Sequence, residues 1–521
     1  MTARSRPTAR SRFAGLIAAL CASLLVLAGC GSGDQESVRP GGDLVYARAD
    51  DTTTLLPPTT TQNEDIWTLQ QVYETLTLNK PDGTGVQPGL ATDWEESKDK
   101  LSWTFHLREG VKFHSGKELD ADDVVFSLDY ARDQEDEDNL WAGEFAPIKD
   151  VKKVDDHTVR IDLSQPWGPL PSYMALFAAS IYPDDFGGHD AEYMATHADG
   201  TGPFAVDTWN KGQSLRLKKN PDYWQEGVPS LDSVTFNVVT EDNTRRLQLL
   251  GGQADINQEP APLSMSQLAR SQDVRAEAFE STKILYFNLN NTTEELSDPK
   301  LRRAMSYAID RRSVVDVVYA GYADPATSFI SPGLTGHAEE VDGSEFDMDK
   351  AKQLVKESDH PDGADITIQI PSGVADRELL AQIAQQAWQD IGLTVHVQKL
   401  DDATLTTNRT NGDFQVQVSY ATSDVSDTSQ MINFLAVTDD SGIRSGYGNP
   451  KVEKWAKEAV AEEDEAKQNE LYAKIQQQVA DDAPIIPVAY QKALYGISRD
   501  VVDFKPYVLG TYGLRETKLK H

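Results

Sequence analysis

Strand-like and helix-like patterns alternate along the chain, and this alternation limits the fold more than any other feature. At residues 101–107, apolar and polar side chains alternate, which predicts a half-buried strand. In the second half, a strand at 366–370, a helix that starts at Asp376 and stops at Gly392, and a strand at 393–397 follow one another. Such βαβ units require sheets that are covered by helices, so we predict an α/β protein.

The N-terminus has the pattern of a secretory signal. The first thirteen residues carry Arg4, Arg6, Arg10 and Arg12 and no acidic residue, and an apolar run follows at 14–27. That run is too short for a permanent spanning helix. We therefore expect residues 1–29 to be a signal peptide.

The apolar run ends in Leu27, Ala28, Gly29 and Cys30, which resembles the bacterial lipobox. The resemblance implies cleavage before Cys30, lipidation of this cysteine and anchoring at the extracytoplasmic face of the cell membrane. The alternative is an ordinary signal that is cut near Ala28, with Cys30 incidental. A polar stretch with Gly and Ser follows, so we expect residues 30–42 to be a flexible tether.

The cysteine content excludes a disulfide framework in the mature chain. Cys21 would leave with the signal, and Cys30 is the only other cysteine. An exported protein without an internal disulfide depends on its hydrophobic core for stability. About 490 residues would remain, which is enough for two or three packed domains.

The chain is strongly acidic. Its net charge is −34, and loss of the four signal arginines would bring it to about −38 by the same count. Such a surface repels nucleic acid and anionic headgroups, so we expect no nucleic-acid partner. The composition leaves two explanations for this negative charge open, namely a cationic ligand and solubility at a crowded cell surface.

Several sequence blocks stand in a fixed order along the chain: PGLATDW at 88–94, WTFHLREGVKFHSG at 103–116, DDVVFS at 122–127, GTGPF at 200–204, NPDYW at 220–224, LRRAMSYAIDR at 301–311 and APIIP at 483–487. In content and order they closely resemble the family 5 solute-binding proteins of ABC importers. Members of that family bind dipeptides, oligopeptides, nickel chelates and, in some cases, oligosaccharides. The resemblance implies a binding protein, not an enzyme, whose partners are a solute and a permease with its ATPases.

The resemblance also implies a two-lobe, periplasmic-binding-protein-like fold (type II, cluster C) with an extra subdomain in lobe one. The ligand would be enclosed between the lobes by hinge closure. The expected division is 43–80 and 198–282 for lobe one, 81–197 for the extra subdomain, 283–487 for lobe two, and 488–521 for a C-terminal return to lobe one. Apolar strands near 279–289 and 487–495 are expected to cross between the lobes.

A candidate ligand site follows the strand that starts at Val416. In peptide-binding relatives, an Asp after a strand of lobe two pairs with the ligand α-ammonium, and Tyr420 with Asp424 and Asp427 resembles that motif, with about one extra residue between them. A carboxylate that lobe closure buries must be paired, and an ammonium ligand would pair it. The alternative is that both acids cap the loop and the following helix.

Three further residues are weaker candidates for ligand contacts. In a helix expected from Asn63, a stripe of Ile66, Leu69, Tyr73 and Leu76 leaves Trp67 off to one side, where it could face the cleft or pack in the core. Tyr286 and Asn288 alternate on one face of the expected crossover strand and could line the cleft.

One departure from the dipeptide-binding pattern concerns the arginine that holds the ligand carboxylate. In relatives it stands upstream of the helix that carries Trp388, and the matching place here, 371–373, has no Arg. Arg377 is nearer the helix start, where we expect it to be solvated. A longer peptide, or a ligand without a carboxylate, would fit this sequence better than a dipeptide.

Other classes of function have less support. No nucleophile elbow, zinc-protease motif or P-loop occurs, which speaks against a secreted hydrolase. The nine His are scattered, so no metal cage and no cofactor are expected, although a metal chelate could still bind. An oligosaccharide site would need aromatic platforms, which nine Trp leave possible. We expect a monomer.

Overall fold

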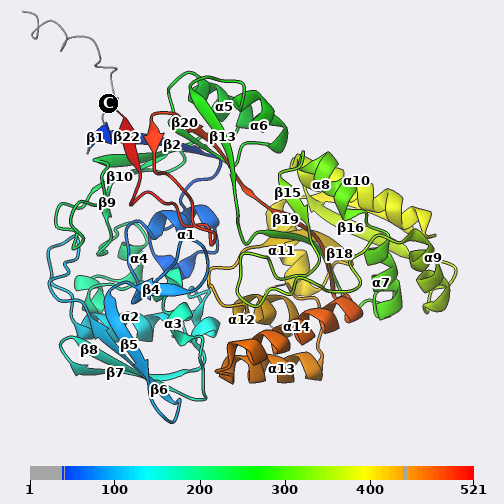
Figure 1. Ribbon diagram of the computed structural model, residues 1–521, viewed down its shortest axis with the longest axis horizontal. Coiled ribbons are helices and arrows are strands. Elements are labelled where there is room, and N and C mark those ends of the chain that lie inside the picture. The colour runs from blue at the N-terminus through cyan, green and yellow to red at the C-terminus, as the bar shows by residue number, and fades with distance from the viewer. Residues whose placement is uncertain (1–37, 40, 438–442, 521) are drawn as a thin grey trace, which may run out of the picture.

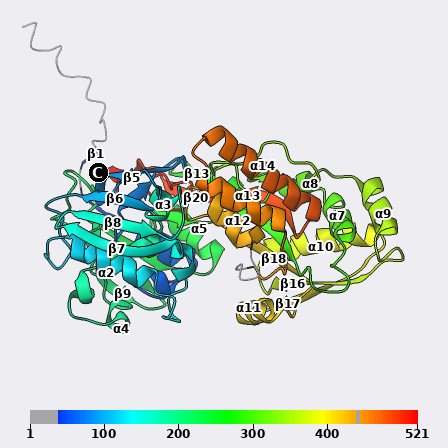
Figure 2. The same cartoon turned by 90° about the horizontal axis from the view of Figure 1, so that it is seen from below.

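The computed structural model describes residues 38–39, 41–437 and 443–520. It has two lobes that lie side by side along the longest axis, and Figures 1 and 2 show them from two directions. The expected signal peptide, Cys30 and most of the expected tether lie outside the described residues. None of the helices within the described ranges is long and apolar enough to span a membrane.

Lobe one is built on a seven-stranded mixed sheet. Its central strand β2 pairs in parallel with β11 and β12, and the remaining pairs are antiparallel. In sheet order, the strands are β13 (Val274–Phe279), β20 (Ala493–Ser498), β12 (Ile256–Gln258), β2 (Asp43–Arg48), β11 (Ser233–Val238), β10 (Ser214–Lys219) and β9 (Phe204–Asn210). The helices α1 (Asn63–Leu69), α5 (Asp242–Leu250) and α6 (Pro262–Leu268) belong to this lobe, as does a small sheet of β1 (Val38–Arg39), β22 (Lys518–Lys520) and β21 (Val501–Val502).

An antiparallel four-stranded sheet forms the extra subdomain of lobe one. Its order is β5 (Ala91–Glu96), β6 (Ser102–Leu107), β8 (Thr158–Leu163) and β7 (Ile148–Asp155), and α2 (Ala121–Ala131) packs on it. The expected strand at 101–107 is present, and its alternation holds at Phe105 and Leu107, which are buried, but not at its start, where Leu101 is exposed and Ser102 is buried. Asp120 caps α2 through the Asp122 and Asp123 amides. Smaller elements complete the region: β3 (Thr77–Asn79), β4 (Val86–Pro88), α3 (Leu170–Tyr173) and α4 (Ala191–Met194).

Lobe two is built on a six-stranded mixed sheet with helices on both faces. In order, its strands are β15 (Ala323–Pro325), β19 (Ile485–Gln491), β14 (Ile284–Leu289), β18 (Val416–Ala421), β16 (Asp365–Pro371) and β17 (Thr394–Leu400). Its helices are α7 (Pro299–Tyr307), α8 (Arg311–Val318), α9 (Met348–Glu357), α10 (Ala375–Asp390), α11 (Asp402–Asn411), α12 (Ser429–Ile432), α13 (Pro450–Ala461) and α14 (Glu465–Asp482). The predicted βαβ unit is confirmed, because β16 and β17 are parallel with α10 between them.

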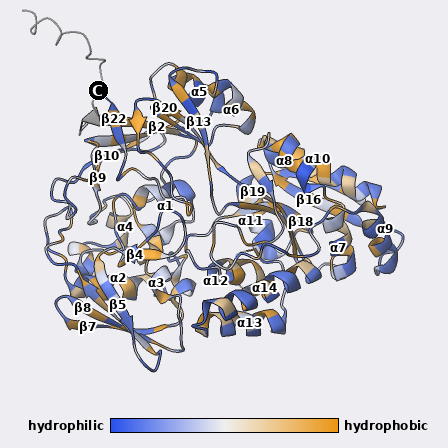
Figure 3. Cartoon of the chain, in the orientation of Figure 1, coloured by the Kyte–Doolittle hydropathy of each residue, from blue (hydrophilic) through white to orange (hydrophobic). Residues whose placement is uncertain are grey.

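Both faces of the lobe-two sheet are covered, so its central strand β14 is buried at every position. Leu285 and Phe287 join one apolar cluster, and Ile284 and Tyr286 join another. In Figure 3, polar and apolar residues alternate along the outer helices α13 and α14, as helices with one buried face require.

The lobes are joined where β13 leads into β14 and where β19 leads into β20, at the places expected for the crossovers. The short segments 280–283 and 492 therefore make the connection. Strand β19 runs on to Gln491, four residues beyond the boundary proposed at 487. The other boundaries of the expected division, between lobe one, its extra subdomain and lobe two, stay predictions.

The helix expected from Asn63 to Leu76 is shorter than the apolar stripe suggested. It ends at Leu69, yet Tyr73 and Leu76 are still buried. The segment after Leu69 continues in turns, and Val72 O accepts the Gly202 amide. A buried segment without helical structure can show the same spacing of apolar residues as a helix. The apolar residues at 66–76 therefore predicted a longer helix than the structure has.

Candidate ligand-binding site

A loop of lobe two, residues 422–428 after β18, lies against lobe one. Ser426 Oγ is 3.3 Å from Ser172 Oγ, and Asn79 Nδ2 donates to the Asp424 carbonyl at 3.3 Å. Just beyond the loop, Tyr173 Oη is 3.3 Å from Ser429 Oγ. Val425, although it belongs to lobe two, packs within the lobe-one core. The motif singled out in the sequence therefore lies at the boundary between the lobes.

The backbone of this loop is held by its own neighbours. Gln430 Oε1 accepts the amides of Asp424 and Val425 at 3.0 and 3.2 Å. The Ser423 amide donates to Thr282 Oγ1, in the crossover between the lobes, at 3.0 Å. The loop conformation is thus set without the Asp424 carboxylate, which leaves that group available for another partner.

The Asp424 carboxylate is buried without a counterion. The residue is 8% exposed, and among the described residues none donates a hydrogen bond or forms an ion pair to its side chain. Burial, and next the nearby charge of Glu144, raise the pKa of Asp424 to about 7. A buried carboxylate in this condition is costly unless a cation reaches it.

Glu144 lies in the 3₁₀ helix Ala142–Phe145 of the extra subdomain. The preceding Trp141 fixes this helix, because its indole donates to Thr60 O at 2.7 Å and its ring packs 4.8 Å from that of Phe177. Burial raises the pKa of Glu144 to about 7. Within the described ranges its carboxylate has no ion pair. No pattern in the sequence singles out this residue.

Asp427 differs from Asp424. Its Oδ1 accepts the Ser429 amide at 2.8 Å and the Tyr472 hydroxyl, from α14, at 3.1 Å. These bonds match the capping alternative that the sequence left open. A contact between Asp427 and a ligand stays a prediction.

Tyr420 is half exposed and lies between two cations. Lys283 Nζ is 4.8 Å and Arg377 Cζ is 5.6 Å from its ring centre. Lys283 also pairs across the lobes with Glu259, at 3.2 Å. Tyr420 therefore presents an aromatic face flanked by positive charge at the end of β18.

The expectation that Arg377 is solvated is wrong. Arg377 is buried, it pairs with Asp376 at 2.8 Å, and its guanidinium approaches Tyr319 Oη at 3.4 Å. The first turn of α10 turns this side chain toward β18, and no local pattern distinguishes that turn from a solvated one.

The three weaker candidates lie deep in the lobes. Trp67 packs edge-on against Tyr512, with ring centres 5.5 Å apart, in the lobe-one core. Its contact with a ligand stays a prediction. Tyr286 and Asn288 were expected to line the cleft, and their contact with a ligand also stays a prediction. Both are fully buried in lobe two, where the Asn288 amide donates to Ile443 O at 2.7 Å.

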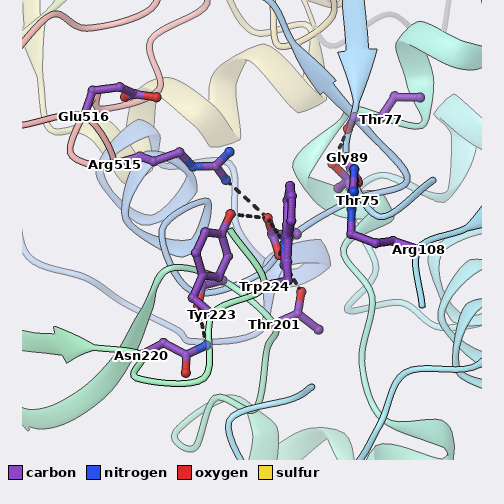
Figure 4. Close-up of polar contacts among 12 residues, drawn as sticks. Thr75, Thr77, Gly89, Arg108, Thr201, Asn220, Tyr223, Trp224, Arg515 and Glu516 are labelled. Carbon is purple, nitrogen blue, oxygen red and sulfur yellow. Dashed lines mark hydrogen bonds and ion pairs between the residues drawn. The ribbon is translucent and has the colours of Figure 1, made fainter. Parts of the chain in front are cut away.

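A second buried carboxylate, Glu74, is fully partnered in lobe one. Figure 4 shows the side chains that converge on it. Its two oxygens accept from Tyr223 Oη at 2.7 Å, Thr201 Oγ1 at 3.0 Å, Trp224 Nε1 at 3.0 Å and Arg515 at 3.2 Å. The sequence analysis missed this cluster, and the only signal was an acid inside the apolar run 72–76.

The Glu74 cluster anchors the C-terminal segment 507–515 to lobe one. That segment and Asn79 line a cavity of about 60 Å³, which is room for a few water molecules and too small for a peptide. Within the described residues there is no cluster of His, Cys, Asp and Glu that could hold a metal.

Comparison with known proteins agrees with this architecture. Residues 85–442 match the sequence model of "Bacterial extracellular solute-binding proteins, family 5 Middle". The probable D,D-dipeptide-binding periplasmic protein DdpA of Escherichia coli K12 is 29% identical over 480 residues, which cover 89% of this chain and 92% of that protein.

Two further relatives are a curated protein and a solved structure. The glutathione-binding protein GsiB of Salmonella paratyphi A is 32% identical over 313 residues, a match that spans 60% of each chain. The Helicobacter pylori periplasmic binding protein DppA, solved with the peptide STSA, superposes with a TM-score of 0.84 at 25% identity, over 94% of this chain and 99% of that one. A two-lobe binding-protein fold is therefore shared across nearly the whole described chain.

Proposed function

Because the chain belongs to family 5 of the bacterial extracellular solute-binding proteins, we propose that it captures a peptide with a free amino terminus and delivers it to an ABC importer. The relatives named above are binding proteins. We accordingly propose capture without turnover, by lobes that close around the ligand.

The observation that carries the proposal is the unpaired Asp424. Its carboxylate is buried at the boundary of the lobes, in a loop whose backbone needs no help from it. A ligand α-ammonium would supply the missing charge and hydrogen bonds, and closure over that pair would exclude water. An N-acylated peptide or a neutral sugar would leave the carboxylate unpaired.

The far end of the peptide is proposed to reach Tyr420. Its exposed ring offers an apolar face, and Lys283 and Arg377 beside it offer positive charge to a carboxylate. Both cations already have acidic partners, Glu259 and Asp376. A free carboxylate would therefore compete with these partners, and we expect it to add less affinity than the amino terminus.

Anchoring through Cys30 is part of the same proposal. A diacylated residue would hold the protein at the outer face of the cell membrane, and the following polar stretch would let the lobes reach the permease. Cys30→Ser should release the protein from the membrane fraction into the medium. Retention of the Cys30→Ser variant in the membrane, together with an unmodified Cys30 in mass spectrometry of the natural protein, would refute lipidation.

Thermal-shift screening of the purified mature protein would test the ligand class. The panel should contain short peptides, the same peptides N-acetylated, oligosaccharides and metal chelates. We expect a stabilising shift only with free-amine peptides, followed by one-to-one binding in calorimetry. A shift with a sugar or a chelate, with all peptides inert, would sink the peptide proposal.

A further inference from the structure

The polar cavity of lobe one lies directly behind the boundary with lobe two. It has a volume of about 60 Å³, and its walls come from the segment after α1, from β3 and β4, and from the C-terminal segment 507–515. From this wall, Asn79 donates to the Asp424 carbonyl of lobe two at 3.3 Å. In the C-terminal segment, Val508 O accepts the Thr282 amide of the crossover at 3.2 Å. The cavity therefore adjoins the residue that is proposed to hold the ligand ammonium.

Asn79 presents a buried hydrogen-bond acceptor without a partner. The residue lines the cavity and is only 7% exposed. Its Nδ2 must be the atom that faces the Asp424 carbonyl, because a carbonyl oxygen only accepts hydrogen bonds. Its Oδ1 is left over, and none of the described residues donates a hydrogen bond to it. A buried acceptor in this condition lowers stability until a donor reaches it.

Two glutamines of the same wall also have free hydrogen-bonding groups. Gln70 Oε1 accepts from Thr511 Oγ1 at 2.6 Å, and its Nε2 donates to none of the described residues. The side chain of Gln87, on β4, makes no hydrogen bond within the described part of the chain. The cavity thus offers an acceptor at Asn79, a donor at Gln70 and an amide with both at Gln87.

The charge and size of the cavity limit the group that it can take. Among the described residues that line it, only Arg515 is charged, and its guanidinium pairs with Glu74 at 3.2 Å. An ion that entered would lose its hydration without gaining a free counterion, so a neutral group is favoured. Room for a few water molecules is also room for the polar end of one side chain. A neutral group that both donates and accepts hydrogen bonds fits best.

We propose that this cavity is a specificity subsite for the first side chain of the bound peptide and that it selects a carboxamide, as in asparagine. While the α-ammonium pairs with Asp424, the carboxamide NH₂ donates to Asn79 Oδ1. The carboxamide oxygen accepts from Gln70 or Gln87. The first side chain is assigned to the cavity because Asn79 contacts the backbone of the residue that holds the ammonium. The inference rests on the peptide-binding function proposed above.

Calorimetry with matched peptides tests the proposal on the unmodified mature protein. Asn-Ala-Ala, Leu-Ala-Ala and Asp-Ala-Ala have first side chains of the same length and branching, and they differ in hydrogen bonding and charge. We expect the asparaginyl peptide to bind about tenfold or more tightly than the leucyl peptide, which leaves the buried polar groups of the cavity without partners. The aspartyl peptide should also bind more weakly than the asparaginyl peptide, because it brings an unbalanced charge.

Substitutions in the wall separate recognition in the cavity from a structural role. Asn79→Leu keeps the size of the side chain and removes its amide, and it should bring the affinities of the asparaginyl and leucyl peptides to within about twofold. Gln87→Leu breaks no hydrogen bond within the described chain, so it serves even if Asn79→Leu does not fold, and it should reduce the preference about threefold. Gln213→Leu, at an exposed glutamine of lobe one, should leave the preference intact.

The outcomes distinguish this inference from the proposed function. Equal affinities of the asparaginyl and leucyl peptides, or tighter binding of the aspartyl peptide, would overturn the inference. If binding still depended on Asp424, the proposed function would stand. An undiminished preference in both wall variants would also overturn the inference, because the preference would then arise outside the cavity. Failure of every free-amine peptide to bind would overturn both.

Discussion

Glu74 and Asp424 are both carboxylates that the fold buries, and their surroundings are opposite. Glu74 receives hydrogen bonds from Thr201, Tyr223, Trp224 and Arg515 and lies inside one lobe. Asp424 receives none from the described residues and lies where two lobes meet. A buried charge with donors on every side holds a structure together, whereas we propose that Asp424, which has none, accepts the charge of a ligand.

The largest expected effect is the loss of stability on removal of Glu74, the carboxylate whose hydrogen bonds are all satisfied. Glu74→Ala would leave the Arg515 guanidinium and three neutral donors buried without an acceptor, so the free energy of unfolding should fall by about 3–5 kcal/mol. Urea unfolding followed by tryptophan fluorescence would measure it. Glu516→Ala, at an exposed acid one residue from Arg515, should change stability by less than about 0.5 kcal/mol. A loss below about 1 kcal/mol in Glu74→Ala would remove the cluster's structural role.

Unlike Glu74→Ala, the substitution Asp424→Asn should weaken ligand binding and leave stability unchanged or higher. Affinity for the best free-amine peptide should fall about 100-fold or more, because the ammonium loses its charged partner. The ligand-free protein should be as stable as the unmodified one, or more so, since an uncompensated buried charge is removed. Calorimetry and thermal unfolding check the two halves. Unchanged affinity would exclude Asp424 from the site.

The unpaired state of Asp424 should also make the stability of the ligand-free protein depend on pH. Burial raises the folded-state pKa of Asp424 to about 7, above its value in the unfolded chain. The folded state therefore binds more protons between about pH 4 and 7, and this group's contribution makes stability fall as pH rises through 7. From pH 6 to pH 8 the loss should be about 1 kcal/mol. The Asp424 contribution should be missing from Asp424→Asn, whereas that of Glu144, whose pKa burial also raises to about 7, should remain. A pH-independent difference between the two proteins would contradict this.

The smallest effect is expected at Asp427, the partnered neighbour of Asp424. Asp427→Asn should lower stability by about 1 kcal/mol, through weaker bonds to the Ser429 amide and the Tyr472 hydroxyl. Affinity for the peptide should change by less than about threefold. A loss of affinity as large as that in Asp424→Asn would make Asp427 a second ligand group.

Individual strands and helices show which parts of the fold the local sequence pattern predicted correctly. The βαβ unit around α10 was predicted and is confirmed, and the predicted strand at 101–107 is present with its alternation kept at Phe105 and Leu107. The helix from Asn63 was overextended, and the burial of β14 at every position, Tyr286 and Asn288 included, was not predicted. A strand that is covered on both faces has no polar side from which its orientation could be inferred.

The residues of the candidate site and its surroundings also fall into those that the sequence revealed and those that it did not. The Tyr420, Asp424 and Asp427 motif was found in the sequence because it is contiguous. Glu144, Arg377 and the Glu74 cluster were missed as site or core features, because their roles arise from contacts with distant segments. Glu74 and Arg515, for example, are separated by 441 residues.

The sequence by itself determined the alternation of strands and helices and the acidic loop after β18, and it predicts an export signal with a candidate lipidation site at Cys30. Periodicity, caps and contiguous motifs are local properties, and they are written in neighbouring residues. Only the tertiary structure decided that Glu74 is paired and Asp424 is not, because the donors for Glu74 and the burial of Asp424 where two lobes meet both depend on how distant segments pack together.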